Sequence, residues 1–295
     1  MTAAELEQVR APTGPAFADA VTFAFGDASA QLYGLARIGL SPGEDGESPR
    51  GSALAVLFSG REPVAAIARG GLEVAGGAGW DSIALGGLRM DVTEPLRDWT
   101  VAMEGEQQGF ELRFQALSPP AVIAGDDAVA RAGGMEGYEQ LCGVTGTVRV
   151  GGKALQVRCL GQRGHGWGEP DWDRIESART IAAWPEAGYG LVLTSVRPEG
   201  AAHAEEPAWA ALLDEEGTLP VGDPRLSTTY DVDGRQRRAG LELWVDGDEH
   251  PLRGSGEVLC GSTLDLGALR LDCAFFRWRI EGETGVGRYD VLRRA

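Results

Sequence analysis

The stretch VTGTVRVGGKALQVRCLGQRGHGWGEPDW, residues 144–172, begins as two segments of alternating apolar and polar side chains, separated by a pair of glycines. Val144 and Val148 share one face of a strand, because successive side chains of a strand point to opposite sides of the sheet. The glycine pair 151–152 supplies the positive φ values that a tight hairpin turn requires. The stretch therefore predicts a β-hairpin, and we interpret the residues from Gly161 onward as a glycine-rich loop.

The rest of the chain repeats this pattern of strands and turns. Short apolar or alternating runs recur at a spacing of about 8–15 residues, which is typical of an all-β sandwich or barrel. Glycine accounts for 44 of the 295 residues, which fits many tight turns. Residues 126–141 predict one short helix, because two adjacent glycines interrupt any longer one. At roughly 150 residues per domain the chain is long enough for two domains.

The charge and hydropathy of the chain argue against several classes of function. A net charge of −17 makes nucleic acid and anionic membrane surfaces unfavourable partners, because both are themselves negatively charged. No apolar run reaches the roughly 18 residues of a membrane-spanning helix. The first residues also lack the basic and apolar regions of a signal peptide. We therefore expect a cytoplasmic protein with no membrane span.

The cysteines and histidines form no recognisable metal or redox motif. The four cysteines have no C-x-x-C spacing and lie in or beside apolar runs, so we expect buried free thiols. The three histidines lack the H-x-H and H-x-x-x-H spacings of metal sites. The sequence therefore predicts no metal site.

The glycine-rich stretch 161–172 has two interpretations. As a structural corner, its glycines allow the close approach of another segment, its two tryptophans cap a barrel end, and Arg163 forms a salt bridge with Asp171. As a catalytic site, it offers His165, which gains and loses a proton near neutral pH. Burial beneath the tryptophans would raise the pKa of Asp171, and tryptophan faces can stabilise a carbocation. Such a group suits proton-driven hydration or cyclisation of an alkene.

Together, YEQLCGVTGTVRVGG and GQRGHGWGEPDW resemble the central signature of the hydroxyneurosporene synthase-like (carotenoid 1,2-hydratase-like, AttH-like) family of the lipocalin/calycin superfamily. That signature has a strand with a Gln, a V-x-G-x-V hairpin and a G-x-R-D-H-S-W-G-x-R-D-W loop. Looser similarity in residues 34–42, 94–105 and 281–294 extends the resemblance over nearly the whole chain. The matching positions are Gln140, Val144–Val148, Arg163, His165, Trp167, Gly168, Asp171 and Trp172.

Three positions depart from this signature. Gly164 replaces its Asp, Gly166 replaces its Ser, and Arg288 replaces an acidic residue of the closing strand. If the Asp donates a proton in relatives, that donor is missing here. Another group would then donate the proton, for which the candidates are His165, Asp171 and Glu139. Alternatively, the chain has no proton donor.

The resemblance implies an all-β fold of two lipocalin-like antiparallel β-sandwich or barrel domains packed side by side. We expect a flexible N-terminus over residues 1–16, a first domain over 17–160 and a second over 161–295. A pocket would lie within or between the domains, because barrels of about eight strands can just hold one small ligand.

For function, the resemblance implies a hydratase or cyclase that acts on a hydrophobic, unsaturated small molecule, such as a terpenoid or polyketide, without a cofactor. His165 would donate or relay the proton, with Asp171 as its orienter. Two alternatives stay open: a carrier of an apolar ligand, and a purely structural or interaction protein. The predicted catalytic residues are His165, Asp171 and Glu139, and the predicted ligand-binding residues are Tyr33, Tyr138, Gln140, Arg163, Trp167 and Trp172.

Overall fold

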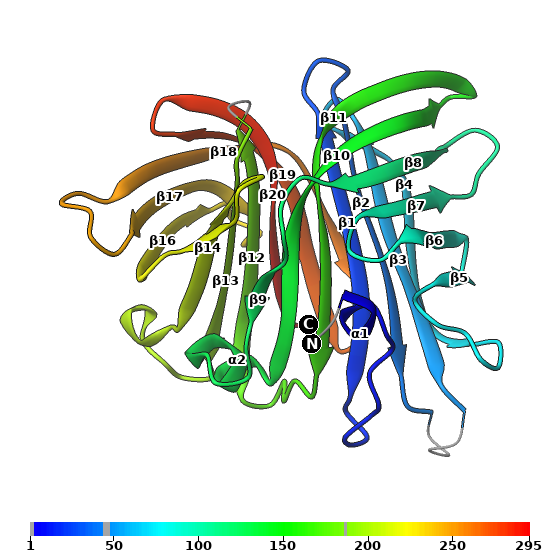
Figure 1. The fold of residues 1–295 in the computed structure, drawn as a ribbon, viewed down its shortest axis with the longest axis horizontal. Helices are drawn as coiled ribbons and strands as arrows, with labels where there is room; N and C mark the ends of the chain where they lie inside the picture. The colour runs from blue at the N-terminus through cyan, green and yellow to red at the C-terminus, as the bar shows by residue number, and fades with distance from the viewer. Residues whose placement is uncertain (1–2, 44–47, 186–187) are drawn as a thin grey trace.

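The computed structural model describes residues 3–43, 48–185 and 188–295, and its strands form two antiparallel sheets side by side (Figure 1). The first sheet contains β1 (Ala18–Asp27), β2 (Leu32–Ser41), β3 (Arg50–Ser59), β4 (Glu62–Glu73), β5 (Ser82–Leu85), β6 (Leu88–Glu94), β7 (Asp98–Met103), β8 (Gly109–Ala116), β9 (Ala121–Ile123), β10 (Met135–Val150) and β11 (Lys153–Gly168). The second contains β12 (Ile175–Pro185), β13 (Gly190–Pro198), β14 (Ala208–Leu213), β15 (Thr218–Pro220), β16 (Asp223–Tyr230), β17 (Gln236–Trp244), β18 (Leu252–Asp265), β19 (Leu269–Ile280) and β20 (Glu283–Arg294). The short helices are α1 (Ala3–Leu6), α2 (Ala128–Gly133) and the 3-10 helix η1 (His203–Glu205).

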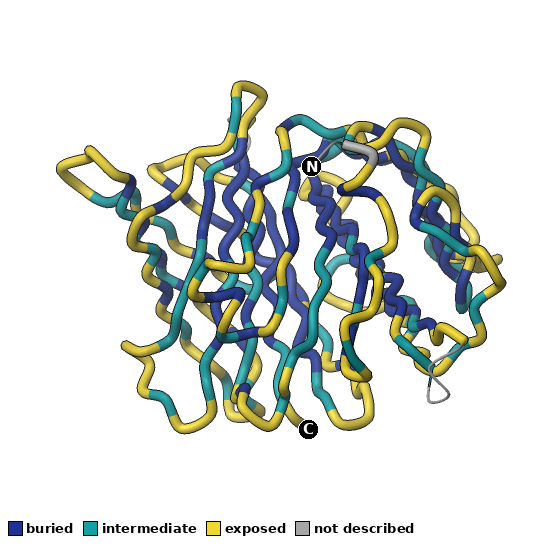
Figure 2. The backbone as a smooth tube through the Cα atoms, turned by 60° about the horizontal axis from the view of Figure 1, so that its bottom comes forward, coloured by how far each residue is buried: buried dark blue, intermediate teal, exposed yellow. Residues whose placement is uncertain are grey.

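Each sheet curls around a core of its own. The strand order is β4-β3-β2-β1-β11-β10-β8-β7-β6-β5 in the first sheet, with β9 paired to β10, and β15-β14-β13-β12-β20-β19-β18-β17-β16 in the second. Trp99 is buried inside the first sheet and Trp278 inside the second. A further cluster joins the two sheets, where Tyr33 and Phe275 stack with ring centroids 5.5 Å apart. Buried residues accordingly continue through the centre of the molecule (Figure 2). The expected all-β fold of two side-by-side units is confirmed.

The hairpin predicted around the glycine pair is formed by β10 and β11, with φ of 58° at Gly151 and 77° at Gly152. The stretch interpreted as a loop from Gly161 is instead strand. β11 continues to Gly168, paired with β10 on one side and β1 on the other. Glycine suits this central position, because a Cβ at Gly161 would overlap the carbonyl of Ala24 on β1. The glycines therefore reflect close packing inside the sheet rather than a loop.

The chain passes from the first sheet to the second between Gly168 and Ile175. The expected division after residue 160 thus falls inside β11. The helix expected within residues 126–141 is α2, which ends at Gly134 with φ of 64°, before β10 begins.

The N-terminal segment, expected to be flexible, packs against one end of the first sheet. Leu6 and Glu7 are buried there, and Glu7 forms an ion pair with Arg163 of β11. An ionic partner holds Glu7 because a buried charge is costly unless it is paired. Leu6 and Glu7 therefore tie the segment to the first sheet, while most of residues 8–16 are exposed.

The cysteines are free thiols, as expected, three of them buried and Cys159 partly buried. Within the described ranges, no helix combines the length and hydrophobicity needed to cross a membrane.

Candidate functional site

Strand alternation divides the predicted site residues between the two faces of the first sheet. His165 and Arg163 point into that sheet's own core, whereas Glu139 points towards the second sheet. The structure therefore does not gather the predicted residues into one site. Tyr138, Gln140 and Trp167 lie on the side of His165, and Tyr33, Asp171 and Trp172 lie elsewhere.

His165 is buried with both ring nitrogens occupied by protein atoms. Nε2 lies 2.6 Å from Oδ1 of Asp19, and Nδ1 lies 3.0 Å from the carbonyl oxygen of Leu6. A carbonyl only accepts, so Nδ1 donates to Leu6, and Nε2 is the nitrogen that faces Asp19. Burial lowers the pKa of His165, and its hydrogen bond with Asp19 opposes that shift. With both nitrogens engaged, His165 has no free atom for a substrate.

Arg163 and Glu7 form the second half of this buried arrangement. Nη2 of Arg163 donates to Oε2 of Glu7 at 2.7 Å, and Nη1 donates to the hydroxyl of Tyr138. The guanidinium also lies over the rings of Trp99 and Tyr138, 5.1 and 4.7 Å from their centroids. The second oxygen of Glu7 accepts from Nε1 of Trp99 at 3.1 Å. We call the set Leu6, Glu7, Asp19, Arg163 and His165 the N-terminal anchor, because it fixes the first residues to β1 and β11.

Two predicted roles on the β11–β12 connection are wrong. Asp171 is exposed and its carboxylate accepts from the backbone N–H of Asp173 at 3.1 Å, so it neither orients His165 nor pairs with Arg163. Asp19 and Glu7 take those two roles instead. Strand β11 explains the difference, because it carries residues 163 and 165 back into the sheet before residue 171 is reached.

The other aromatic and amide residues that were predicted to bind a ligand make contacts within the protein. Trp172 packs against the cluster of Val129, Ile175 and Val196 rather than near His165. Trp167 lies beneath the guanidinium of Arg10, 4.1 Å from it, and edge-on to His165. The Gln140 amide donates to the carbonyls of Leu96 and Ser118 at 3.0 and 3.1 Å.

Sequence reasoning missed Asp19 and Glu7 for different reasons. Asp19 interrupts the apolar run FADAVTFAF at a position that alternation places on the core face with Val21 and Phe23. A lone acid on an apolar strand face was therefore a usable signal. Glu7 lies in the short helical and turn region before β1, where no periodicity marks it as buried.

On the opposite face of the first sheet, Glu139 occupies a gap left by Gly164. Residues 37, 22, 164 and 139 lie in register across β2, β1, β11 and β10. A Cβ at position 164 would overlap the carboxylate of Glu139. The carboxylate that the family signature places at 164 is therefore absent, and that of Glu139 fills its space from the neighbouring strand.

Strand β20 of the second sheet presents Arg288 and Asp290 to Glu139. Nη2 of Arg288 lies 4.0 Å from Oε1 of Glu139, and Nη1 donates to Oδ2 of Asp290 at 3.0 Å. Nε of Arg288 donates to Gln162 Oε1 at 2.9 Å, and the Gln162 amide donates to Glu139. We call Glu139, Gln162, Arg288 and Asp290 the intersheet cluster. It places two carboxyl groups around one guanidinium where the sheets meet.

Burial makes both carboxyl groups of the intersheet cluster weaker acids. Burial raises the pKa of Glu139, while Arg288 opposes the shift. Burial likewise raises the pKa of Asp290 to about 6, again against Arg288. The Glu139 side chain keeps 15% of its surface exposed. Raised pKa values of this kind favour the protonated form of both carboxyl groups.

We expect the contribution of Asp290 to stability to decline as pH rises. Its pKa is about 6 when folded against an ordinary value of 3.8, so between these values the folded state binds more protons than the unfolded state. The unfolding free energy of the native chain minus that of Asp290→Asn should fall by about 3 kcal/mol in all between about pH 3 and 7, and level off above. Urea titrations at several pH values measure it. A difference that does not change with pH would contradict the assignment.

A separate pocket of about 730 Å³ lies at the end of the first sheet beside the N-terminal anchor. Its walls are mainly apolar and include Val9, Phe17, Leu40 and Val74, with Asp19 at the side of the anchor. Within the described ranges, no three His, Cys, Asp or Glu side chains are grouped to hold a metal ion.

We compared the chain with known protein families, curated proteins and solved structures. A family model described as a domain of unknown function (DUF7064) matches residues 2–295. No curated protein matches the chain. A putative AttH from Nitrosomonas europaea has a similar structure, with a TM-score of 0.67 and 13% identity over 95% of this chain and 92% of that one.

Two further solved structures are similar to the chain. CghA with Sch210972 has a TM-score of 0.65 and 13% identity over 95% of this chain and 89% of that one. Kievitone hydratase from Nectria haematococca has a TM-score of 0.65 and 11% identity over 94% and 88%. At these identities the likeness shows the fold, and it confirms the lipocalin-like architecture expected from the AttH-like resemblance.

Proposed function

The chain belongs to the DUF7064 family, and we propose that it is an enzyme that hydrates or cyclises a hydrophobic, unsaturated small molecule without a cofactor. The observation that carries this proposal is Glu139, a carboxyl group with a raised pKa that lies between the two sheets and is partly exposed. The similar structures support the choice of reaction, since one is named a hydratase and another was solved with the compound Sch210972.

In the proposed hydration, protonated Glu139 transfers its proton to one carbon of a double bond. The other carbon becomes cationic, the oxygen of a water molecule bonds to it, and that water returns a proton to the carboxylate. The net change is addition of one water. In cyclisation, a second double bond of the same molecule attacks the cation, a carbon–carbon bond closes the ring, and a neighbouring carbon returns the proton.

The intersheet cluster would assist both versions. Burial raises the pKa of Glu139, which is the direction that a general acid requires. Arg288 would hold the carboxylate in place after the proton has left. Partly buried apolar side chains of the cluster between the sheets, including Leu117 and Leu292, would contact the hydrocarbon part of the substrate. We assign His165 a positioning role, since both its nitrogens hold the N-terminal anchor.

Glu139→Gln tests the proposal, because Gln keeps the shape and the hydrogen bonds but cannot donate a carboxyl proton. The purified chain is incubated with a panel of terpenoid and polyketide polyenes, and products are detected by liquid chromatography and mass spectrometry. Hydration adds the mass of one water, and cyclisation changes retention at constant mass. We expect Glu139→Gln to lower turnover by about 10²–10⁴-fold. Glu62→Gln, at an exposed acid that starts β4, is the matched control. Full turnover by Glu139→Gln would refute the assignment.

A carrier of an apolar ligand is the second candidate, favoured by the pocket beside the N-terminal anchor. Its volume of about 730 Å³ lies within the range of small-molecule sites. The carboxylate of Asp19, which borders it, is fully engaged by His165, Trp80 and the Arg10 N–H, so no reactive group faces the ligand. Native mass spectrometry of freshly purified protein tests it. Carriage would be favoured if an apolar molecule copurifies with the protein and is released from it unchanged. The Val74→Asp variant should then no longer bind this molecule, whereas Glu139→Gln should still bind it.

A further inference from the structure

A cleft of about 610 Å³ lies between the β1–β2 and β3–β4 turns of the first sheet and strands β17, β18 and β19 of the second, away from both sites described above. The first sheet contributes Tyr33, at the start of β2, and Arg61, in the turn between β3 and β4. The second sheet contributes Arg237, Arg238 and Arg277, together with Glu257 as the one acidic residue that lines it. We call this the arginine cleft, since four guanidinium groups surround it.

The positive charge of the arginine cleft is poorly compensated within the described part of the chain. Arg238 lies 3.6 Å from Glu257, but Arg61, Arg237 and Arg277 have no ion pair or hydrogen bond with any described residue. The chain has 44 acidic and 27 basic residues, yet Glu257 is the one described acid that lines this cleft. Four like charges around one cleft also repel one another, so the arrangement is unfavourable while the cleft is empty.

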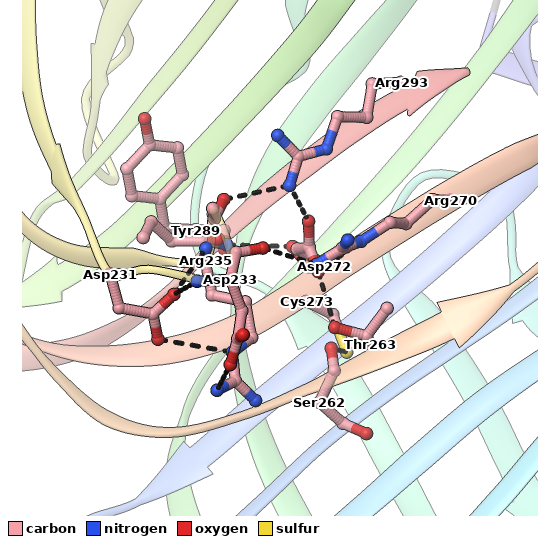
Figure 3. A network of polar contacts seen from close by, with 12 residues as sticks. Asp231, Asp233, Arg235, Ser262, Thr263, Arg270, Asp272, Cys273, Tyr289 and Arg293 are labelled. Carbon is pink, nitrogen blue, oxygen red and sulfur yellow. Dashed lines mark hydrogen bonds and ion pairs between the residues drawn. The ribbon is translucent and has the colours of Figure 1, made fainter. Parts of the chain in front are cut away.

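Three other arginines of the second sheet and its turns have carboxylate partners (Figure 3). Arg235, two residues before Arg237, pairs with Asp231 and Asp233 at 3.3 and 2.7 Å. Arg270 and Arg293 both pair with Asp272. Carboxylates therefore neutralise Arg235, Arg270 and Arg293, whereas three of the four cleft arginines have no such partner among the described residues.

Tyr33 adds a neutral donor to the arginine cleft. Its ring is fixed by stacking on Phe275, and its hydroxyl has no hydrogen-bond partner among the described residues. Burial raises the pKa of Tyr33, so the hydroxyl remains protonated and can donate. Tyr33, predicted from sequence as a ligand-binding residue, thus lies beside cations rather than beside His165.

We propose that the arginine cleft binds a small polyanion, a molecule with two or more phosphate or carboxylate groups. Guanidinium groups suit these ligands, because their planar donors match both kinds of anion bidentately. Arg61 and Arg277 come from different sheets, so a bound polyanion would also bridge the two halves of the molecule. The site is separate from Glu139, and its occupancy does not depend on the proposed reaction.

Calorimetric titration of the full chain tests the proposal with two probes, pyrophosphate and citrate, at constant ionic strength set with NaCl. We expect at least one probe to bind, and Arg61→Gln and Arg277→Gln each to weaken it about tenfold or more. Arg279→Gln is the matched control, because Arg279 is exposed on the same strand but does not line the cleft. Binding of pyrophosphate alone identifies a phosphate ligand, and binding of citrate alone a carboxylate ligand.

Two results would overturn the proposal. One is heat of binding no greater than that of the NaCl control for both probes. The other is binding that survives Arg61→Gln and Arg277→Gln, or that Arg279→Gln weakens equally. Thermal unfolding of each variant without ligand confirms that it is folded. Both results concern binding at the arginine cleft alone and do not depend on whether Glu139 is catalytic.

Discussion

Replacing Glu7 with Ala is expected to lower the free energy of unfolding by about 3–5 kcal/mol, because it leaves the buried Arg163 guanidinium without a counter-charge. The Nε1 group of Trp99 and the backbone N–H of Leu96 lose their acceptor as well, at 3.1 and 2.9 Å in the native chain. Urea denaturation followed by tryptophan fluorescence measures the change, since Trp99 lies within the affected core.

Two further variants identify the cause of this loss. Glu5→Ala alters an exposed acid of the same segment and should change stability by no more than about 0.5 kcal/mol. The double variant Glu7→Leu with Arg163→Met removes both charges and should recover much of the lost stability, because apolar replacement of a buried pair is often neutral. If Glu7→Ala behaved like Glu5→Ala, the N-terminal segment would not be anchored as described.

Replacing Gly164 with Asp, which restores the family signature, is expected to lower both the stability and the turnover of this protein. The backbone conformation at position 164 is that of a regular strand, which any residue can adopt. A Cβ at this position, however, would overlap the Glu139 carboxylate. The new carboxylate would displace Glu139 and add a second negative charge beside it. We expect unfolding free energy to fall by about 3 kcal/mol and turnover to fall about 100-fold. Denaturation and the polyene assay measure the two effects.

A double variant separates this effect from a general intolerance of position 164. Glu139→Gly together with Gly164→Asp moves the single carboxylate from β10 to β11 and leaves Arg288 one partner on the first sheet. We expect it to be more stable than the sum of the two single changes by at least about 1 kcal/mol, as neighbouring residues couple. Strictly additive effects would show that Glu139 does not fill the space of residue 164.

The sequence predicts the fold well where the decisive pattern is local. Alternation over residues 144–160 and the glycine pair are enough to predict the β10–β11 hairpin, because both the period of a strand and the φ of a turn are set within a few residues. The glycines after Gly161 are misleading, since glycine allows a loop and also allows close packing of strands. Only the pairing of β11 with β1, which involves distant residues, decides between the two.

The site is harder to predict, because its members are distant in sequence. The sequence predicts Asp171 as the partner of His165, because the two are only six positions apart. The partner in the structure is Asp19, which is 146 positions away. Glu139 is predicted as a candidate, but its relation to Arg288 of β20 and to the gap at Gly164 depends on how the sheets meet. The arginine cleft has no motif at all, since its residues come from both sheets.

The N-terminal anchor also has a consequence for how the chain is made. Glu7 leaves the ribosome early, but Arg163 is 156 residues further along the chain. At translation rates of about 5–20 residues per second, Glu7 waits roughly 8–30 s for its partner. Strand β11 then has to insert between β1 and β10, so the first sheet cannot close during that interval. Glu7 is thus among the last residues of the first sheet to reach its native contacts, although it is synthesised before the strands that hold it.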